Sequence, residues 1–524
     1  MARRLRARFL AFSAAVMLIA PSAWAAERFI DPAAGSDAGD GSAASPWKTL
    51  EQVAASGAFG TTITAGDTVW LRSGHHGAPV LTGGDFTPAV ILAAAPGQKP
   101  TASQITWKGA KGWALRGLSI SPSYAPSPTP GGNMVSMDGS SARITLEDCA
   151  LFSVANASGW GADEWINVAS SGVSVRGTDI TVRRNQLTNV RFGISVDGKG
   201  ALIEHNSVVG FSADGLRGLG DDGVYQYNLI KNVYVSDADG DGNHDDGFQS
   251  WSVGPGGVGT GVVKNVVLRG NVFINREDPN QKLSNAMQGI GCFDGTFEGW
   301  VVENNVVVTD HWHGISFYGM RDSRIVNNTV IDVNTDKPGP PWIKVTPHKD
   351  GTPSQNVLIR NNLATDFQLE GTSITDDHNT TLTDLSLFFV APATFDLHLL
   401  PGAPAVDTGS ADMAPPLDAE GITRPQGGGV DLGAYEWHEP SVEPADGGVG
   451  GNGGSGSGNG GSAGAPGSGG GGAIGGEGGS GGQAGADPGC GCAVPGQSPG
   501  PAAAALWGLA AMLAWRRRRI RERT

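Results

Sequence analysis

Four polar side chains recur directly before a glycine along the middle of the sequence. These residues are Asp214, Asp246, Gln288 and His313. Carboxyl and imidazole groups are the ones that enzymes most often use to move protons. If the four positions lie on successive turns of a repeating structure, a strand spacing of about 4.8 Å brings them into one row. The sequence therefore predicts a row of acid, amide and imidazole groups on one flank of the molecule, as expected of a sugar-binding groove.

Alternation along a strand predicts which residues after each glycine face inward and which face solvent. The predicted interior stack is Ile194, Leu216, Phe248, Ile290 and Ile315. The first column predicted to be exposed is Ser195, Arg217, Gln249 and Ser316, and the second is Asp197, Trp251, Phe293 and Tyr318. Aromatic faces and amides suit the binding of pyranose rings. The predicted substrate-binding set is Gln249, Trp251, Gln288, Phe293, Trp312 and Tyr318.

An acidic loop over residues 237–246 predicts a cation site beside this row. It contains the D-x-D-x-D-G start of an EF-hand-like loop, although Phe248 stands where the bidentate Glu would be. We expect calcium, because so many carboxylates close together repel one another without a cation. The ion is either structural, held by Asp237, Asp239 and Asp241, or catalytic, held by Asp222, Asp245 and Asp246. The alternative is a solvated acidic loop.

The elements that must position these groups repeat along the chain between about residues 144 and 363. Short β-branched runs end in a recurring asparagine, at Asn185, Asn206, Asn228, Asn271, Asn305, Asn328 and Asn362. A period near 22 residues, with longer gaps where loops are inserted, indicates one coil per repeat. Asparagine suits a stacked corner, because it tolerates the left-handed conformation and can hydrogen-bond to its neighbours. Since a leucine ladder is missing, we predict an all-β, single-stranded right-handed parallel β-helix.

The segments flanking the repeats resemble β-helix proteins of the pectate-lyase-like superfamily. Residues 29–37, 45–50 and 66–72 look like the N-terminal cap of these proteins, with a short helix near residues 50–55. Residues 397–407 and 433–436 look like the last coils of surface-anchored members. The resemblance covers about residues 28–437. It implies a polysaccharide partner and leaves lyase, hydrolase, epimerase and adhesin functions open.

Within that resemblance, a calcium-assisted lyase acting on a uronic-acid polymer is the favoured function. Such lyases use a bound ion, aspartates on neighbouring coils and a basic residue as the base. The implied catalytic set is Asp214, Asp246, His313, Arg217, Arg321 and Lys349. Inverting hydrolysis or epimerisation is the alternative enzyme function, since the Asp and His-Gly stations are similar to those of β-helix polygalacturonases. A non-catalytic carbohydrate-binding adhesin is the third hypothesis.

Both termini of the chain indicate export. Residues 1–26 read as a signal peptide, residues 27–437 as the β-helix domain, and residues 438–489 as a disordered Gly/Ser-rich tether. Residues 490–524 carry Cys490 and Cys492, a short apolar segment and an Arg-rich end. They resemble myxobacterial sorting tails, which implies a membrane anchor and a processing protease that acts near these cysteines. We expect a monomer that is held at the cell surface or released.

The charge of the chain between the leader and the tail excludes a nucleic-acid partner. The leader carries four arginines, and the tail from Cys490 onward carries six arginines and one glutamate, so the net charge of −15 for the whole chain becomes −24 without them. Such a body repels polyanions unless a cation or a local basic patch reverses the field. His205 and His244 are expected to be structural, and Cys149 and Cys292 to be buried core thiols.

Overall fold

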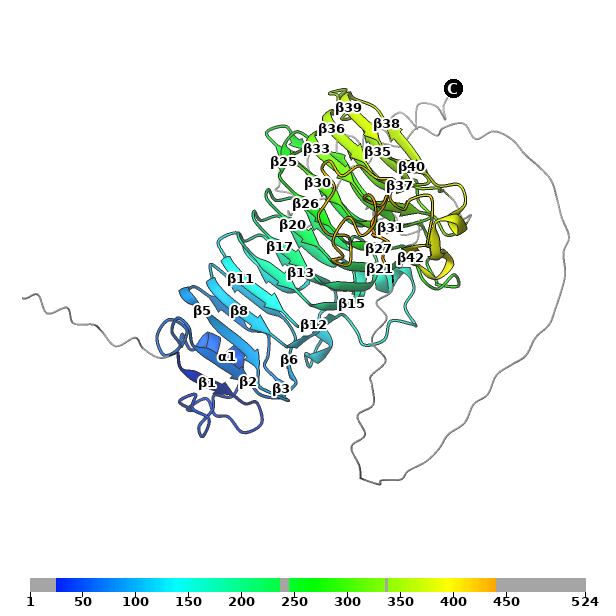
Figure 1. Ribbon diagram of the computed structural model, residues 1–524. Coiled ribbons are helices and arrows are strands. Elements are labelled where there is room, and N and C mark those ends of the chain that lie inside the picture. The colour runs from blue at the N-terminus through cyan, green and yellow to red at the C-terminus, as the bar shows by residue number, and fades with distance from the viewer. Residues whose placement is uncertain (1–24, 236–244, 335–337, 440–524) are drawn as a thin grey trace, which may run out of the picture. The chain divides into compact units, whose positions relative to one another are not determined.

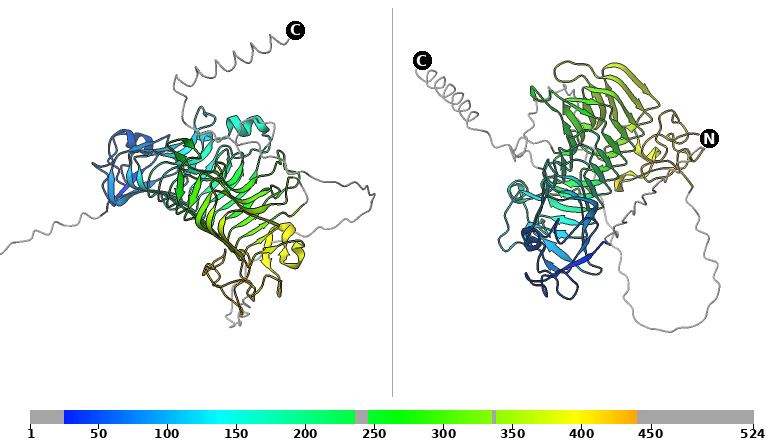
Figure 2. Two further views of the ribbon diagram at one scale, coloured as in Figure 1. Left: turned by 90° about the horizontal axis from the view of Figure 1, so that it is seen from above. Right: turned by 90° about the vertical axis from the view of Figure 1, so that its left-hand side faces the viewer.

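Three long sheets of parallel strands make up the body of the protein. The computed structural model describes residues 25–235, 245–334 and 338–439, and the described residues up to Trp437 form one compact unit. We call the 15-stranded sheet A, the 11-stranded sheet B and the 12-stranded sheet C. The chain passes through B, A and C in turn and then returns to B one coil further along, as β16, β17, β18 and β19 do (Figures 1 and 2). This winding is a parallel β-helix, as predicted.

The elements have the following bounds. Sheet B contains β4 (Val80–Thr82), β7 (Ile105–Lys108), β10 (Asn133–Met137), β13 (Ser171–Val175), β16 (Ile194–Val196), β19 (Leu216–Gly218), β22 (Asp246–Trp251), β28 (Gln288–Asp294), β32 (His313–Tyr318), β35 (Trp342–Thr346) and β38 (Asp366–Leu369). Sheet A contains β1 (Glu27–Ile30), β2 (Thr68–Leu71), β5 (Asp85–Ala94), β8 (Lys111–Arg116), β11 (Ala142–Glu147), β14 (Thr181–Arg183), β17 (Leu202–Glu204), β20 (Val224–Gln226), β25 (Val262–Lys264), β26 (Val267–Arg269), β29 (Thr296–Glu298), β30 (Val301–Glu303), β33 (Met320–Val326), β36 (Gln355–Arg360) and β39 (Thr372–Asp377). Sheet C contains β3 (Gly74–His75), β6 (Pro100–Ala102), β9 (Ser119–Ile120), β12 (Ala150–Phe152), β15 (Gln186–Val190), β18 (Ser207–Phe211), β21 (Leu229–Val233), β27 (Val272–Ile274), β31 (Val306–Val308), β34 (Thr329–Ile331), β37 (Leu363–Ala364) and β40 (Thr380–Thr381). Outside these sheets lie the hairpins β23 (Val253–Gly254) with β24 (Gly257–Val258) and β41 (Phe389–Ala391) with β42 (Asp396–Leu399), the helix α1 (Leu50–Ala55) and the short turns η1 (Pro122–Tyr124), η2 (Glu164–Val168), η3 (Leu385–Leu387) and η4 (Pro392–Thr394).

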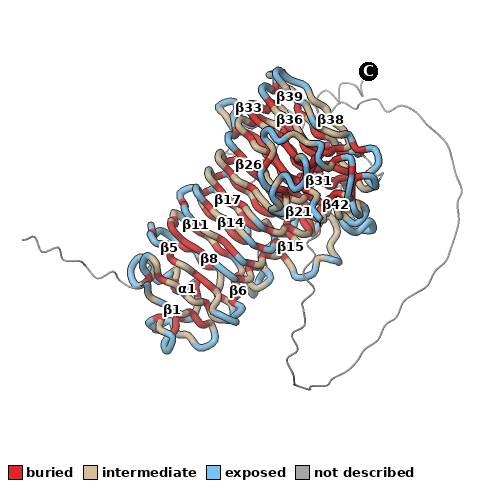
Figure 3. Tube along the Cα trace, in the orientation of Figure 1, coloured by how far each residue is buried: buried red, intermediate tan, exposed pale blue. Residues whose placement is uncertain are grey.

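The core lies inside the coils, where side chains of successive strands stack in register. The predicted interior residues of sheet B pair directly with one another and are fully buried, in the order Ile194, Leu216, Phe248, Ile290 and Ile315. The predicted interior stack is therefore confirmed. Cys149 and Cys292 are buried free thiols, as expected, and burial raises the pKa of Cys149 to about 12. Figure 3 shows buried residues along strands such as β8, β11 and β14, with exposed residues at the turns.

A ladder of buried asparagines joins the coils at the corner between sheets A and C. In each step one side-chain oxygen accepts hydrogen bonds from the backbone and side chain of the preceding asparagine, as Asn271 does from Asn228 at 3.1 and 2.9 Å. The Nδ2 of Asn271 donates to the carbonyl of Tyr225. The ladder runs through the seven predicted asparagines and continues to Asn379. The predicted stacked corner is thus confirmed.

The left-handed residue of this corner is not the ladder asparagine. Positive φ angles occur one residue earlier, for example at His205, Tyr227 and Asn304. The ladder asparagine needs its side chain for hydrogen bonds to the next coil, so the preceding residue makes the turn. Our assignment of the left-handed conformation to the ladder asparagines is wrong. His205 is structural, as expected, and its ring stacks on Tyr227 at 5.2 Å.

The two ends of the described chain close the coils differently. The helix α1 begins after Thr49, whose side chain accepts the backbone N–H of Gln52, and it buries Leu50 and Val53, as predicted. Residues 397–407 and 433–436 are not further coils, because the coils end at β40. The chain instead turns back along the A–C corner, where Asn304 donates to Leu417 O and Asn327 to Asp431 O. This segment covers a second apolar cluster.

Several predictions concern residues outside the described ranges. These are the signal peptide up to residue 24, the loop with Asp237, Asp239, Asp241 and His244, the tether from residue 440 and the tail with Cys490 and Cys492. Within the described ranges, no helix has both the length and the apolar character needed to cross a membrane.

Candidate functional site

The four residues of the predicted row lie at one corner of the coil, where the chain enters sheet B. Asp214 stands just before β19, and Asp246, Gln288 and His313 are the first residues of β22, β28 and β32. Asp246 pairs directly with Gln288, and the residues that follow stay in register to β32. Asp246 and His313 thus lie on the same flank, two strands apart. At about 4.8 Å per strand their backbones are roughly 10 Å apart.

The row at this corner faces outward together with the column that starts three residues later. Asp214 forms an ion pair with Arg217, Asp246 accepts from Gln249 at 3.1 Å, and His313 contacts Ser316 at 2.9 Å. The same contact between residues i and i+3 recurs because each coil repeats the same backbone path. One outer surface of sheet B therefore carries both columns.

Most of these outward side chains are covered by their neighbours. Arg217 and Gln249 are 4% exposed, Trp251 is 2% exposed and Phe293 is 6% exposed. The guanidinium of Arg217 lies 4.1 Å from the ring centre of Phe192 and 5.0 Å from that of Trp251. The prediction of exposure is wrong for these four residues, since long side chains on adjacent strands pack flat on one another, and it is confirmed for Asp197.

A bulge also changes the second predicted column. The register between β22 and β28 shifts after Ser250, so Trp251 pairs with Asp294 and not with Phe293. Phe293 turns toward the next coil, where its ring centre lies 4.7 Å from that of His313 and 5.2 Å from that of Tyr318. The predicted alignment of Trp251 with Phe293 fails, because one extra residue enters β28 at this point.

Asp246 is the most unusual titratable group of this surface. Its side chain is fully buried, its backbone N–H donates to Asp214 Oδ1 at 3.1 Å, and its Oδ2 accepts from Gln249. Burial first, and then the charges of Asp214 and Asp245, raise the pKa of Asp246 well above its usual value, while Arg217 opposes the shift. Its Oδ1 has no hydrogen-bond partner within the described part of the chain.

A gap in the outward column lies next to this oxygen, at Gly291. Gly291 pairs with Gln249 on one side and with Ser316 on the other. A Cβ atom there would overlap Asp246 Oδ1 and would lie 2.7 Å from the ring of Phe293. Two further buried polar atoms of this surface, Gln288 Oε1 and Trp251 Nε1, also have no hydrogen-bond partner in the described residues. Such groups are costly when they are left without a partner.

Aromatic rings and imidazoles surround His313 on the far side of the gap. Its Nδ1 lies 2.9 Å from Ser316 Oγ and 3.3 Å from Trp342 Nε1, and its ring stacks on that of His311 at 5.3 Å. Trp312 is 44% exposed and lies nearly parallel to Trp342, with ring centres 6.2 Å apart. This end of the surface therefore offers an open aromatic platform.

Lys344 adds a positive charge to the platform. It follows Ser316 in the outward column, and its Nζ lies 4.8 Å from the ring centre of Trp342 and 5.6 Å from that of Tyr318. In the described ranges it has no carboxylate within ion-pair distance. Lys344, Trp342, His311 and Gly291 were not predicted from the sequence. Trp342 pairs with His313, but a register shift skips the glycine position and pairs Ile343 with Ile315, so the glycine motif is absent from this coil.

Three predicted site residues lie away from this surface. Arg321 belongs to β33 of sheet A and pairs with Glu298. Lys349 forms an ion pair with Asp294 at 3.0 Å, beyond the opposite end of the sheet B strands. Asp222 is a left-handed corner residue between sheets B and A, where it contacts Lys199 and Asn265, each at 2.9 Å. The structure does not bring them together with Asp246 and His313.

The donors proposed for a catalytic calcium ion do not converge. Asp222 lies at another corner from Asp245 and Asp246, and Asp237, Asp239 and Asp241 lie outside the described residues. Among the described residues, no three His, Cys, Asp or Glu side chains form a group that could hold a metal ion. The calcium site stays a prediction that concerns the loop over residues 237–246.

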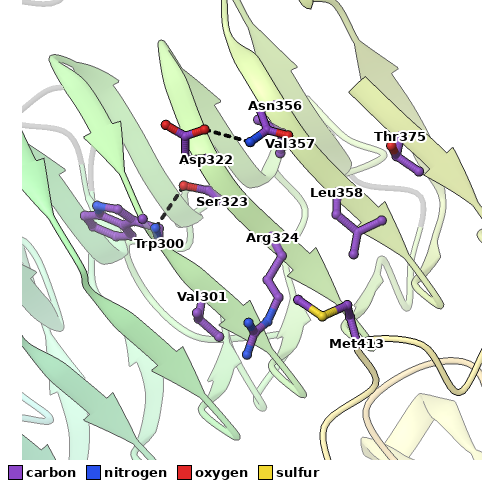
Figure 4. Close-up of a pocket in the computed structure, with 11 residues that line it drawn as sticks. Trp300, Val301, Asp322, Ser323, Arg324, Asn356, Val357, Leu358, Thr375 and Met413 are labelled. Atoms are coloured by element: carbon purple, nitrogen blue, oxygen red, sulfur yellow. Dashed lines mark hydrogen bonds between the residues drawn. The ribbon is translucent and has the colours of Figure 1, made fainter. Parts of the chain in front are cut away.

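Two cavities lie elsewhere on the coils. One of about 320 Å³ opens on sheet A, between outward residues of β30, β33 and β36 and Met413 of the returning segment; Figure 4 shows Arg324 between Val301 and Leu358 there. Another, of about 380 Å³, is lined by Asn133 and Met134 of β10. Since β10 is a strand of sheet B, this second cavity lies on the same sheet as Asp246, four strands away.

Comparison with known proteins agrees with this architecture. A model of the right-handed β-helix region matches residues 171–339. The chain is a right-handed parallel β-helix. Among solved structures this β-helix resembles the pectate lyase Pel9A (12% identity, 79% of this chain and 96% of the other, TM-score 0.39). It also resembles a rhamnogalacturonan lyase (12% identity, 70% of this chain and 90% of the other, TM-score 0.35). A third similar structure is the Dettilon tailspike protein (14% identity, 65% of this chain and 64% of the other, TM-score 0.35). No curated protein sequence matches the β-helix.

Proposed function

We propose that this β-helix binds an acidic polysaccharide across sheet B and cleaves it by β-elimination at the gap over Gly291. The observation that carries the proposal is the buried Asp246 carboxyl, whose Oδ1 has no hydrogen-bond partner among the described residues and lies against Gly291, where the outward column has no side chain. A buried carboxyl with a raised pKa, beside a gap and aromatic rings, is typical of a catalytic group.

The surroundings of the gap supply the binding groups. Trp312 and Trp342 form a platform on which a pyranose ring can stack. Lys344 offers an ammonium group to the C6 carboxylate of a uronic acid and locally opposes the repulsion from a strongly acidic protein. The cavity at β10, on the same sheet, provides room for sugars further along the polymer.

In the proposed step, ionised Asp246 removes the proton at C5 of the bound uronate. The electrons of the C5–H bond form the C4–C5 double bond, and the C4–O bond to the next sugar breaks. The proton then passes from Asp246 to the departing oxygen, which restores the carboxylate. A raised pKa suits this role, because it makes the carboxylate a stronger base.

Arg217 and Lys349 are poor choices for the base. Arg217 is paired with Asp214 and packed between two rings, and Lys349 is paired with Asp294. A calcium ion held by the loop before Asp246 is a further part of the proposal, as are export and attachment at the cell surface. If present, the ion would supply charge neutralisation beside the substrate carboxylate.

Inverting hydrolysis is the second candidate, favoured by the buried carboxyl of Asp246. Inverting glycosidases protonate the glycosidic oxygen with one group and activate a water molecule with another. In that reaction Asp246 would be the acid that protonates the glycosidic oxygen. The raised pKa of Asp246 is compatible with this role as well.

Absorbance near 235 nm tests the proposal, because elimination creates an unsaturated product. The full chain is incubated with polygalacturonate, alginate and glycosaminoglycans, with and without calcium, beside the Asp246→Ala variant and the control Asp322→Ala. A rise that Asp246→Ala abolishes and Asp322→Ala retains supports elimination. New reducing ends without absorbance would replace it with hydrolysis, and binding without either product would replace it with an adhesin.

A further inference from the structure

The imidazole of His313 receives hydrogen bonds on one defined nitrogen. Trp342 Nε1 lies 3.3 Å from His313 Nδ1 and 3.1 Å from Ser316 Oγ, while Ser316 Oγ lies 2.9 Å from the same Nδ1. An indole N–H can only donate, so the atoms it faces must accept. His313 Nδ1 is therefore an acceptor and carries no proton.

The hydroxyl of Ser316 also donates to His313 Nδ1. Since His313 Nδ1 carries no proton, the hydrogen bond between it and Ser316 Oγ must be donated by the serine hydroxyl. Ser316 is fully buried and His313 is 8% exposed, so little water competes for these bonds. Two donors facing one nitrogen leave a single neutral tautomer, with the ring proton on Nε2.

Its neighbour His311 is held in the same way. The backbone N–H of His313 donates to His311 Nδ1 at 3.0 Å. A backbone N–H also only donates, so His311 likewise keeps its proton on Nε2. The two rings stack at 5.3 Å with an interplanar angle of 23°. Positive charges on both rings at once would repel each other at this distance.

We infer that Trp342 and Ser316 are positioning residues that lock His313 as a neutral imidazole with its proton on Nε2, so that it can donate a hydrogen bond but does not act as the base of the proposed reaction. Its part in the reaction rests on the proposed function, but the tautomer itself does not. The removal of the C5 proton is left to Asp246.

Nitrogen-15 NMR of the full chain, labelled at its ten histidines, tests the lock without any substrate. His313 is assigned by the signal that His313→Gln removes. We expect its Nε2 to be protonated and its Nδ1 to be unprotonated near neutral pH. In Trp342→Phe, which keeps a ring but removes the N–H, both tautomers should appear. Ser316→Ala should keep the Nε2–H form, because the indole still faces Nδ1.

Trp312→Phe is the matched control. Trp312 stacks on Trp342, but the hydrogen bond that fixes His313 comes from the indole of Trp342. It should leave the His313 signals unchanged. A proton on Nδ1 in the unaltered chain, or an unchanged tautomer in folded Trp342→Phe, would overturn the inference. Because these signals are read without substrate, failure to form product would defeat the proposed function and leave the lock standing.

Discussion

Asp246 Oδ1 occupies the space that a side chain at position 291 would need. Gly291 stands between Gln249 and Ser316 in an otherwise filled column, and a methyl group there would overlap this oxygen. The missing side chain therefore does two things. It lets the carboxyl of Asp246 lie flat against the next coil, and it makes the position of this carboxyl sensitive to any side chain introduced at 291.

Gly291→Ala should reduce activity without unfolding the chain. The overlapping atoms belong to the ends of the Asp246 and Phe293 side chains, which can shift, and Gly291 does not have a positive φ. A displacement of the carboxyl by about 1 Å costs on the order of 10²-fold in rate. Initial rates at 235 nm measure the effect. Gly159→Ala is the control, since nothing lies within 4 Å of its Cβ position. Equal rates for both variants would contradict the role of the gap.

The pH dependence of the rate should follow the ionisation of Asp246. Burial and the neighbouring carboxylates Asp214 and Asp245 raise its pKa, and Arg217 and Gln249 oppose this only in part. If Asp246 is the base, the rate rises as pH increases through this raised pKa, because only the carboxylate accepts a proton. If it is the acid of a hydrolase, the rate falls over the same range. The sign of the slope of kcat/KM against pH separates the two reactions.

Asp246→Asn should abolish activity and yet stabilise the fold near neutral pH. A group whose folded-state pKa is raised stabilises the fold below its unfolded pKa, and that contribution is lost as pH rises through the folded pKa. Asparagine removes this loss and can still accept from Gln249. We expect a rise of a few degrees in Tm at pH 7 and none at pH 3, measured by calorimetry. A lower Tm at pH 7 would show that the ionised carboxyl is well solvated.

Much of this site followed from the sequence, and the remainder depended on local packing. The glycine motif placed Asp214, Asp246, Gln288 and His313 in one row, because each coil repeats the same backbone path. The exposure of the outward side chains was mispredicted for most of them. Alternation along a strand predicts the face of the sheet on which a side chain lies, but it does not predict which neighbours cover that side chain. Trp251 is buried by Arg217, and the bulge in β28 could not be foreseen from alternation alone.

Lys344 should contribute binding to an acidic polymer. Lys344→Met keeps the aliphatic stem over Trp342 and Tyr318 but removes the charge. We expect KM for polygalacturonate to rise on the order of 10-fold, equivalent to about 1.4 kcal/mol, with a smaller change in kcat. The dependence of KM on salt should also become weaker. Lys264→Met, which removes a charge from sheet A, is the control. An unchanged KM in Lys344→Met would argue against recognition of the carboxylate by this residue.

The asparagine ladder should be the most sensitive part of the scaffold. Asn271→Ala leaves the buried N–H of Asn228 and the carbonyl of Tyr225 without their partners. Each unsatisfied buried group costs roughly 1–3 kcal/mol, so the free energy of unfolding should fall by about 3 kcal/mol. Urea denaturation followed by circular dichroism measures this loss. Asn265→Gly is a matched control, because Asn265 is exposed and has φ 57°, which glycine adopts freely. If both variants unfold at the same urea concentration, the ladder does not hold the coils together, and the stacked interior alone must do so.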